Sequence, residues 1–175
     1  MVPSLPAKLW QLSETGRLRC KVLADKIMPY SPQVIVTSTE PKATETAQII
    51  SDLLGKTFTM VEGLQEHDRS NVAWLDTERF EAKVAEFFRH PQALVSGNET
   101  AKQAYGRFAS AIAVIINEHP ASNIAIIAHG TVISLFVAQV VGVEPFHFWK
   151  QLGLPSFAVL PLPQMHKVIA LENRI

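Results

Sequence analysis

His129 is the first residue of this sequence whose surroundings indicate chemistry. It follows the short aliphatic run 124–128, and Gly130 then opens an almost wholly apolar run of helical length that ends before Gly142. The end of a central strand beside a helix N-terminus is where open α/β sheets bind ligands, and the free N–H groups there favour anions. A histidine at that point can bind a ligand or act in catalysis near neutral pH. The same pattern fits a capped core histidine equally well.

Lys42 is the second candidate, because the segment 38–47 is again the end of a β-branched strand (34–37) running into a helix. If the two strands are parallel, both helix N-termini open at one edge of the sheet. The Lys42 ammonium would then lie beside a bound anion, where a point charge suits phosphate. Taken alone, Lys42 is more typical of a solvated lysine in a first helical turn.

Glu66 is the third candidate and lies in the polar, irregular segment 63–71, with His67, Asp68 and Arg69 beside it. A carboxyl group near an apolar cleft, with a raised pKa, can act as a general acid. Taken alone, the segment is more typical of a charged surface loop.

The rest of the chain predicts the elements that position these groups. After an extended N-terminal segment, 1–10, apolar periodicity and capping residues predict helices and strands in alternation. The predicted helices are 14–28, 41–54, 76–89, 99–118 and 132–141, with one or two further turns in 144–151, and the predicted strands are 34–37, 57–61, 124–127, 157–160 and 168–171. This order predicts an α/β fold, a three-layer sandwich with a mostly parallel sheet.

Composition narrows the class of protein. The 175 residues are 47% hydrophobic and 18% charged with a formal net charge of zero, which argues against a nucleic-acid surface. The single cysteine, Cys20, fits a reducing compartment, and the longest apolar run is far shorter than a membrane span. We therefore expect a soluble, cytoplasmic protein without membrane or nucleic-acid partners, and the sequence shows no metal cluster or cofactor motif.

Five ordered motifs make the chain resemble the histidine phosphatase superfamily, with its phosphoglycerate mutase-like fold, over essentially its whole length. They are 12–16, 37–47, 64–66, 97–100 with Arg107, and His129-Gly130. The resemblance implies that His129 and Gly130 help to bind the phosphoryl group and that Glu66 is the general acid. It places Lys42 where the family has a phosphate-binding arginine, and it implies that Ser38 and Glu99 hold these groups in place.

The family opens with a strand that ends in Arg-His-Gly, whose histidine is the nucleophile, and no Arg-His-Gly occurs in this sequence. We therefore expect one domain over 1–175 that is incomplete at its N-terminus, inactive as given, and left with a gap beside the strand 124–127. We expect the gap to be closed by a shifted N-terminal segment or by a partner chain. Assembly into a homo-oligomer is therefore one alternative.

The sequence and the resemblance leave three hypotheses about what this chain does. The first is a phosphoric monoester hydrolase that acts through a phosphohistidine once the upstream segment is present. The second is a non-catalytic remnant, an anion-binding or regulatory module. An unrelated α/β protein with a coincidental histidine is the third. The expected ligand is a small phosphorylated substrate or inorganic phosphate, bound weakly because the charged pocket residues are reduced to Lys42 and His129.

Overall fold

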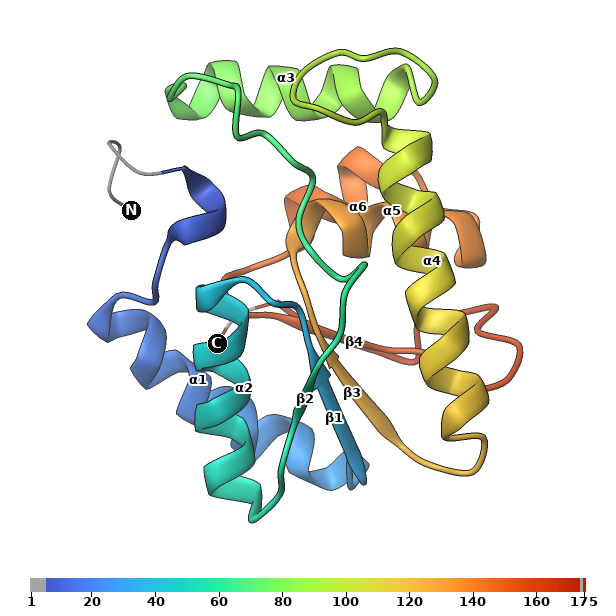
Figure 1. Cartoon of the computed structure of the whole chain (residues 1–175). Coiled ribbons are helices and arrows are strands. Elements are labelled where there is room, and N and C mark those ends of the chain that lie inside the picture. The colour runs from blue at the N-terminus through green and yellow to red at the C-terminus, as the bar shows by residue number, and fades with distance from the viewer. Residues whose placement is uncertain (1–5, 174) are drawn as a thin grey trace.

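The computed structural model describes residues 6–173 and 175, and its core is a parallel sheet with the strand order β2-β1-β3 (Figure 1). The strands are β1 (Val34–Thr37), β2 (Thr59–Met60), β3 (Ile124–Ile127), β4 (Phe157–Val159) and β5 (Ala170–Glu172). The helices are α1 (Glu14–Ile27), α2 (Pro41–Leu54), α3 (Thr77–Arg89), α4 (Ala101–Glu118), α5 (Gly130–Val141) and α6 (Pro145–Gln151), with short 3-10 turns η1 (Ala7–Leu9) and η2 (Met28–Tyr30).

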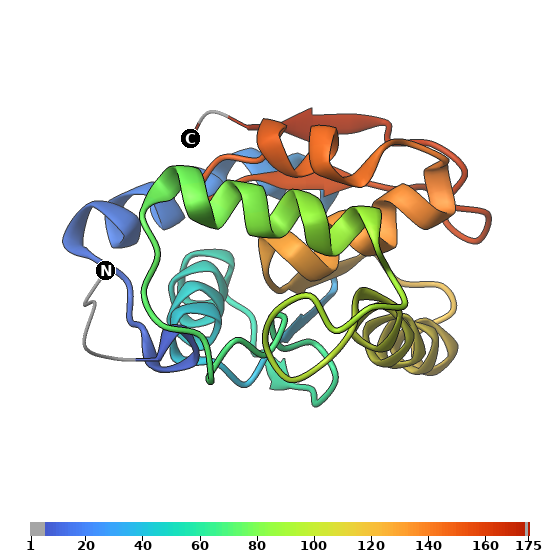
Figure 2. The same ribbon diagram turned by 90° about the horizontal axis from the view of Figure 1, so that it is seen from above.

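Helices cover both faces of the sheet, which confirms the predicted three-layer α/β sandwich. Ile35 of β1 packs with residues of α1 and α2 on one face, whereas its neighbour Val36 packs with residues of α3, α4 and α5 on the other. Successive side chains of a strand point to opposite faces, so one short strand joins both cores. Figures 1 and 2 show α2 and α4 on opposite sides of the strands.

Capping residues set the first and last residues of several helices close to the positions that the sequence predicts. Ser13 Oγ accepts a hydrogen bond from Gly16 N at 3.1 Å at the start of α1, and Thr100 with Gln103 forms a capping box at the start of α4. Gly142 ends α5 in the left-handed region, at φ 81°. The predicted strand 57–61 is reduced to two exposed residues, and the N-terminal segment forms η1 where an extended loop was predicted.

The buried face of α1 differs from the predicted one. Periodicity favours Leu18, Val22, Leu23 and Ile27 as the inward face, but Leu18 and Val22 are 56% and 44% exposed. The helix buries Cys20, Leu23 and Ala24 instead. The small side chains let α1 approach α2 closely, and that contact overrides the apolar stripe read from the sequence.

The sheet stops at β3. One edge of β3 pairs with β1 in parallel, with Thr37 opposite Ile127, and no strand of the described residues pairs with its other edge. The strands β4 and β5 form a separate antiparallel pair, although Phe157 of β4 packs in the same apolar cluster as Ile127. Within the described part of the chain, the other edge of β3 is therefore unpaired, and the incomplete domain stays a prediction. Among these residues, no helix has the length and apolar character of a membrane span.

Candidate active site

Ser38 and His129 meet where β1 and β3 end. The two strands are parallel and in register, so the residues that follow them leave the sheet at the same edge, and Ser38 N donates to Ile127 O at 2.9 Å. His129 is the N-cap of α5, and its Nε2 lies 2.8 Å from Ser38 Oγ. Both side chains are buried. The structure thus brings together two of the predicted site residues, with Gly130 as the first residue of α5.

Glu66 reaches this point from the loop after β2 and caps α5. Its Oε2 accepts from Thr131 N at 3.2 Å, and its Oε1 accepts from His67 N at 2.9 Å. Burial by itself raises the pKa of Glu66, but the nearby Arg69, then His129 and the two N–H donors outweigh it and lower the pKa below its ordinary value. The side chain is therefore a carboxylate near neutral pH, whereas a resident general acid needs a raised pKa.

Glu40 is a site residue that the sequence analysis missed. Its side chain is buried, its Oε1 accepts from Glu66 N at 2.8 Å, and the same oxygen lies 3.7 Å from His129 Nε2. Its Oε2 forms an ion pair with Lys42. The signal available in the sequence is an acidic residue one position after the Ser38-Thr39 strand end, at the N-cap of α2. The site therefore holds an internal carboxylate between the predicted cation and the predicted histidine.

Lys42 is near the site, but its ammonium is engaged by the protein. It donates to Glu40 and to the backbone oxygen of Ala7 in η1, the latter at 2.9 Å. Its side chain is 24% exposed. The structure thus pairs the predicted phosphate-binding cation with a neighbouring carboxylate that neutralises its charge.

Burial lowers the pKa of His129 below its ordinary value. The carboxylates of Glu66 and Glu40 act in the opposite direction, and the cations Lys42 and Arg107 add to the lowering. The imidazole is therefore neutral near pH 7 in the unliganded protein. It stabilises negative charge fully only after it takes up a proton.

Arg107 of α4 and Glu99 hold the loop that carries Glu66. The Arg107 guanidinium donates twice to the Glu99 carboxylate, at 2.6 and 3.0 Å, and to the backbone oxygens of Gly63, Gln65 and Glu66 at 2.7 to 3.0 Å. All five of its N–H groups are used. Glu99 therefore fixes the arginine that holds the loop of Glu66, and its predicted supporting role in a phosphate site stays a prediction.

His67 has a structural position beside this loop. Its ring stacks on Phe87 with a centroid separation of 4.0 Å, and its Nε2 lies 2.9 Å from Ser96 O. Gly97 is packed so closely that a Cβ there would lie 2.7 Å from His67 Nε2. These contacts fix the imidazole in the core of the loop, away from Ser38.

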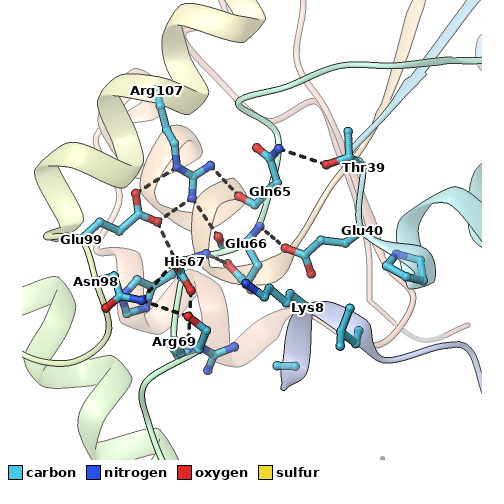
Figure 3. Close-up of a pocket in the computed structure, with 15 residues that line it drawn as sticks. Lys8, Thr39, Glu40, Gln65, Glu66, His67, Arg69, Asn98, Glu99 and Arg107 are labelled. Carbon is cyan, nitrogen blue, oxygen red and sulfur yellow. Dashed lines mark hydrogen bonds and ion pairs between the residues drawn. The ribbon is translucent and has the colours of Figure 1, made fainter. Parts of the chain in front are cut away.

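A cleft of about 650 Å³ opens to solvent in front of Glu40 and Glu66 (Figure 3). Its lining residues come from η1, the start of α2, the loop 65–70 and the start of α4, and they include Lys8, Glu40, Glu66, Arg69, Glu99 and Arg107. Ser38, His129 and Lys42 do not line it. No group of three or more His, Cys, Asp or Glu residues in the described ranges is arranged to hold a metal ion.

Known proteins place this arrangement in a family. The model of the histidine phosphatase superfamily (branch 1) matches residues 10–172. The uncharacterized phosphatase PhoE of Bacillus subtilis (strain 168) is 23% identical over 134 residues, which are 77% of this chain and 66% of that protein. The chain thus spans 66% of the length of this relative.

Solved structures agree on the fold. A phosphoserine phosphatase from Entamoeba histolytica, in complex with 3-phosphoglyceric acid, is 16% identical, with a TM-score of 0.78 over 97% of this chain and 87% of that chain. A mycobacterial glucosyl-3-phosphoglycerate phosphatase is 19% identical, with a TM-score of 0.67 over 85% and 76%. The likeness of these structures supports the phosphoglycerate mutase-like architecture, and the family match over residues 10–172 shows that the chain belongs to the histidine phosphatase superfamily.

Proposed function

We propose that this chain provides the acid and charge-stabilising half of a phosphoric monoester hydrolase site. The observation that carries the proposal is the meeting of His129, Ser38 and Glu66 at the N-terminus of α5 in a chain of this family. A helix N-terminus next to a histidine suits a phosphoryl group, because N–H donors and a protonatable imidazole both stabilise its charge. The names of the relatives, which are phosphatases, support the same reaction class.

The expected chemistry follows from the charges around His129. A phosphoryl dianion bound beside α5 raises the pKa of both His129 and Glu66, since negative charge favours the protonated form of each group. The imidazolium then stabilises the charge of the transferring group, and the protonated Glu66 gives its proton to the leaving oxygen. The lowered pKa of each group in the unliganded protein is therefore compatible with these roles once substrate is bound.

The nucleophile has to come from a segment other than those described. The family's nucleophilic histidine belongs to an Arg-His-Gly strand, and that tripeptide does not occur in the 175 residues. Among the described residues one edge of β3 is unpaired, and this supports a place for one further strand beside His129. Covalent transfer needs a nucleophile in line with the leaving oxygen, so we expect negligible turnover from residues 1–175 alone.

The test compares hydrolysis of an aryl phosphate by the 175-residue chain and by a version extended with an upstream strand that ends in Arg-His-Gly. The extended protein should gain turnover, and His129→Ala in that protein should reduce it by about a hundredfold or more, the scale of losing one oxyanion-stabilising group. His90→Ala is the matched control, because His90 is an exposed residue at the end of α3 and does not line the cleft. Equal turnover by the short chain, lost on His129→Ala, would contradict this assignment of the nucleophile.

A non-catalytic anion-binding module is the second candidate, and the ion pair of Glu40 with Lys42 favours it. A site whose cation is already neutralised is poorly equipped to hold a phosphoryl group during transfer. The same experiment separates the candidates. Phosphate binding without turnover in the extended protein would support the module.

A further inference from the structure

A short N-terminal segment, residues 6–9, separates Lys42 from the cleft, and we call this segment the strap. The Lys42 ammonium donates to the backbone oxygen of Ala7 at 2.9 Å and also to the Glu40 carboxylate. Residues 7–9 line the cleft, whereas Lys42 does not line it. Figures 1 and 2 show η1 beside the N-terminal end of α2, outside the helices that cover the sheet. The strap therefore covers the cation of the candidate site.

The strap is held in this position without a buried side chain. The turn η1 (Ala7–Leu9) buries none of its residues, and Leu9 is 50% exposed. Leu9 N donates to Pro6 O at 2.9 Å, so the turn is closed by a hydrogen bond of its own. Segments with few buried apolar contacts and exposed backbone hydrogen bonds open at a small cost in free energy. The position of the strap therefore depends on polar contacts with other elements.

Two polar contacts hold the strap closed. The first is the hydrogen bond from Lys42 to Ala7 O. The second involves Lys8, whose side chain extends from η1 towards the loop after β2 in Figure 3. The pKa of Asp68 in that loop is lowered to about 2, above all by a hydrogen bond from Asn98, and the Lys8 ammonium adds to the lowering. Lys8 thus attracts a carboxylate across the cleft, and this attraction is weak because the Lys8 side chain is exposed.

A ligand and the closed strap compete for the same ammonium. A lysine has three N–H donors, and in the closed position the Lys42 ammonium serves both Glu40 and Ala7 O. An oxyanion that enters through the cleft meets the strap before it meets Lys42, because the strap forms the wall on that side. Contact with Lys42 therefore requires an open strap. By linkage, an anion that makes this contact favours the open position.

Resting on the proposed function, we propose that the strap is an autoinhibitory device, which closes the candidate site in the unliganded protein and has to move away before a phosphate-like oxyanion can bind Lys42. Only molecules with an open strap bind such a ligand, so the observed affinity is lower than that of the open form by the open fraction. One partly exposed charge-assisted hydrogen bond and one weak attraction correspond to a lowering of about fivefold. Any interaction that keeps residues 6–9 away from α2 would therefore activate the site.

The first measurement follows the strap in the 175-residue protein. Inorganic phosphate is added at an ionic strength kept constant with sodium chloride, while NMR records the amide signals of residues 7–9 and the ring signals of His129. We expect the amide signals to move towards random-coil positions as phosphate binds, with the same Kd that the His129 signals report. Amide signals that keep their positions while the His129 signals reach saturation would overturn the inference.

The second measurement uses Leu9→Pro, which opens the strap without removing a buried side chain. Proline removes the Leu9 N–H and disfavours helical backbone at Lys8, so η1 cannot form. We expect this variant to bind phosphate about fivefold more tightly than the wild type. Gln11→Pro is the matched control, because Gln11 is exposed and the preceding Trp10 is already extended, at φ −69° and ψ 139°. It should keep η1 and the wild-type affinity.

Unchanged melting of both variants shows that the fold is retained, and the wild-type titration decides the question by itself if Leu9→Pro does not fold. Equal phosphate affinity of Leu9→Pro and the wild type, or no phosphate binding by either protein, would also overturn the inference. Failure of the proposed function is a separate result, namely no turnover by the extended protein although phosphate opens the strap of the 175-residue chain.

Discussion

Arg107→Lys would test how much of the site depends on one side chain of α4. The Arg107 guanidinium makes five hydrogen bonds of 2.6 to 3.0 Å, two to Glu99 and three to backbone oxygens of the loop 63–66. Lysine keeps the charge but has a single compact ammonium, which can hold two or three of these acceptors at most. The remaining oxygens are left without a donor in a partly buried position.

The expected decrease in the free energy of unfolding follows from the number of hydrogen bonds that are lost. Charge-assisted hydrogen bonds contribute about 1.5–3 kcal/mol each but are not additive, and the Arg107 side chain is 28% exposed. Losing two or three of them should reduce the free energy of unfolding by about 2–4 kcal/mol. Equilibrium unfolding in urea at pH 7 measures this difference directly.

Arg79→Lys is the matched control, because Arg79 is an exposed arginine with one ion pair to Asp76. Its unfolding free energy should stay within about 0.5 kcal/mol of the wild type. If Arg107→Lys also stays within that range, the guanidinium does not brace the loop, and the reasoning from its hydrogen bonds is refuted.

Three further predictions concern the charges around His129. Glu40→Gln should strengthen binding of inorganic phosphate about tenfold in an NMR titration, because it removes a repelling charge and frees the Lys42 ammonium. Ser38→Ala should lower the free energy of unfolding by about 1–3 kcal/mol in urea, because a buried partner of His129 is lost. On acidification, stability should fall first below pH 6.5, where the unfolded chain binds protons at His129 and His67 that the folded form resists because burial lowers the pKa of both. It should fall again below pH 4.5, where the stability from ionised Glu66 is lost.

Each of these has a control and an opposing result. Glu118→Gln and Ser110→Ala change exposed residues of α4 and should alter neither phosphate binding nor stability. His129→Asn should make the pH profile less steep just below 6.5, with His67 contributing the remaining slope, whereas exposed His90→Asn should not change it. Unchanged phosphate affinity in Glu40→Gln would show that Glu40 does not compete with anions. A stability that rises on acidification would reverse the assigned direction of the pKa shifts.

The meeting of Ser38 and His129 was predictable from sequence because it depends on local pattern and one topological rule. Each residue follows a short aliphatic or β-branched run and precedes a helix start, and parallel strands place such points at one edge. The helix limits were predictable for the same reason, since caps such as Ser13 and Gly142 act within a few residues of themselves.

The hydrogen-bond and ion-pair partners of the charged side chains could not be predicted from the sequence. Lys42 could have faced solvent, an anion or Glu40, and only the packing of η1 against α2, with Ala7 O beside the ammonium, decides between them. Asp68 is similar, because one partner of its carboxylate is Asn98, thirty residues away. No short-range pattern in the sequence encodes contacts of this kind.

Two of the donors that a phosphoryl group would use are already occupied by the protein's own carboxylates. Thr131 N at the start of α5 donates to Glu66, and Glu40 takes both the Lys42 ammonium and Glu66 N. A ligand that uses Thr131 N or the Lys42 ammonium must therefore displace a carboxylate oxygen, and the displaced carboxylate has to be protonated or resolvated nearby. A dianionic phosphoryl group meets this demand better than a monoanion, because its stronger field raises the pKa of Glu66 and His129 together. The site is thus expected to discriminate by charge before it discriminates by shape, and weak binding of simple anions follows from the same contacts that order the unliganded loop.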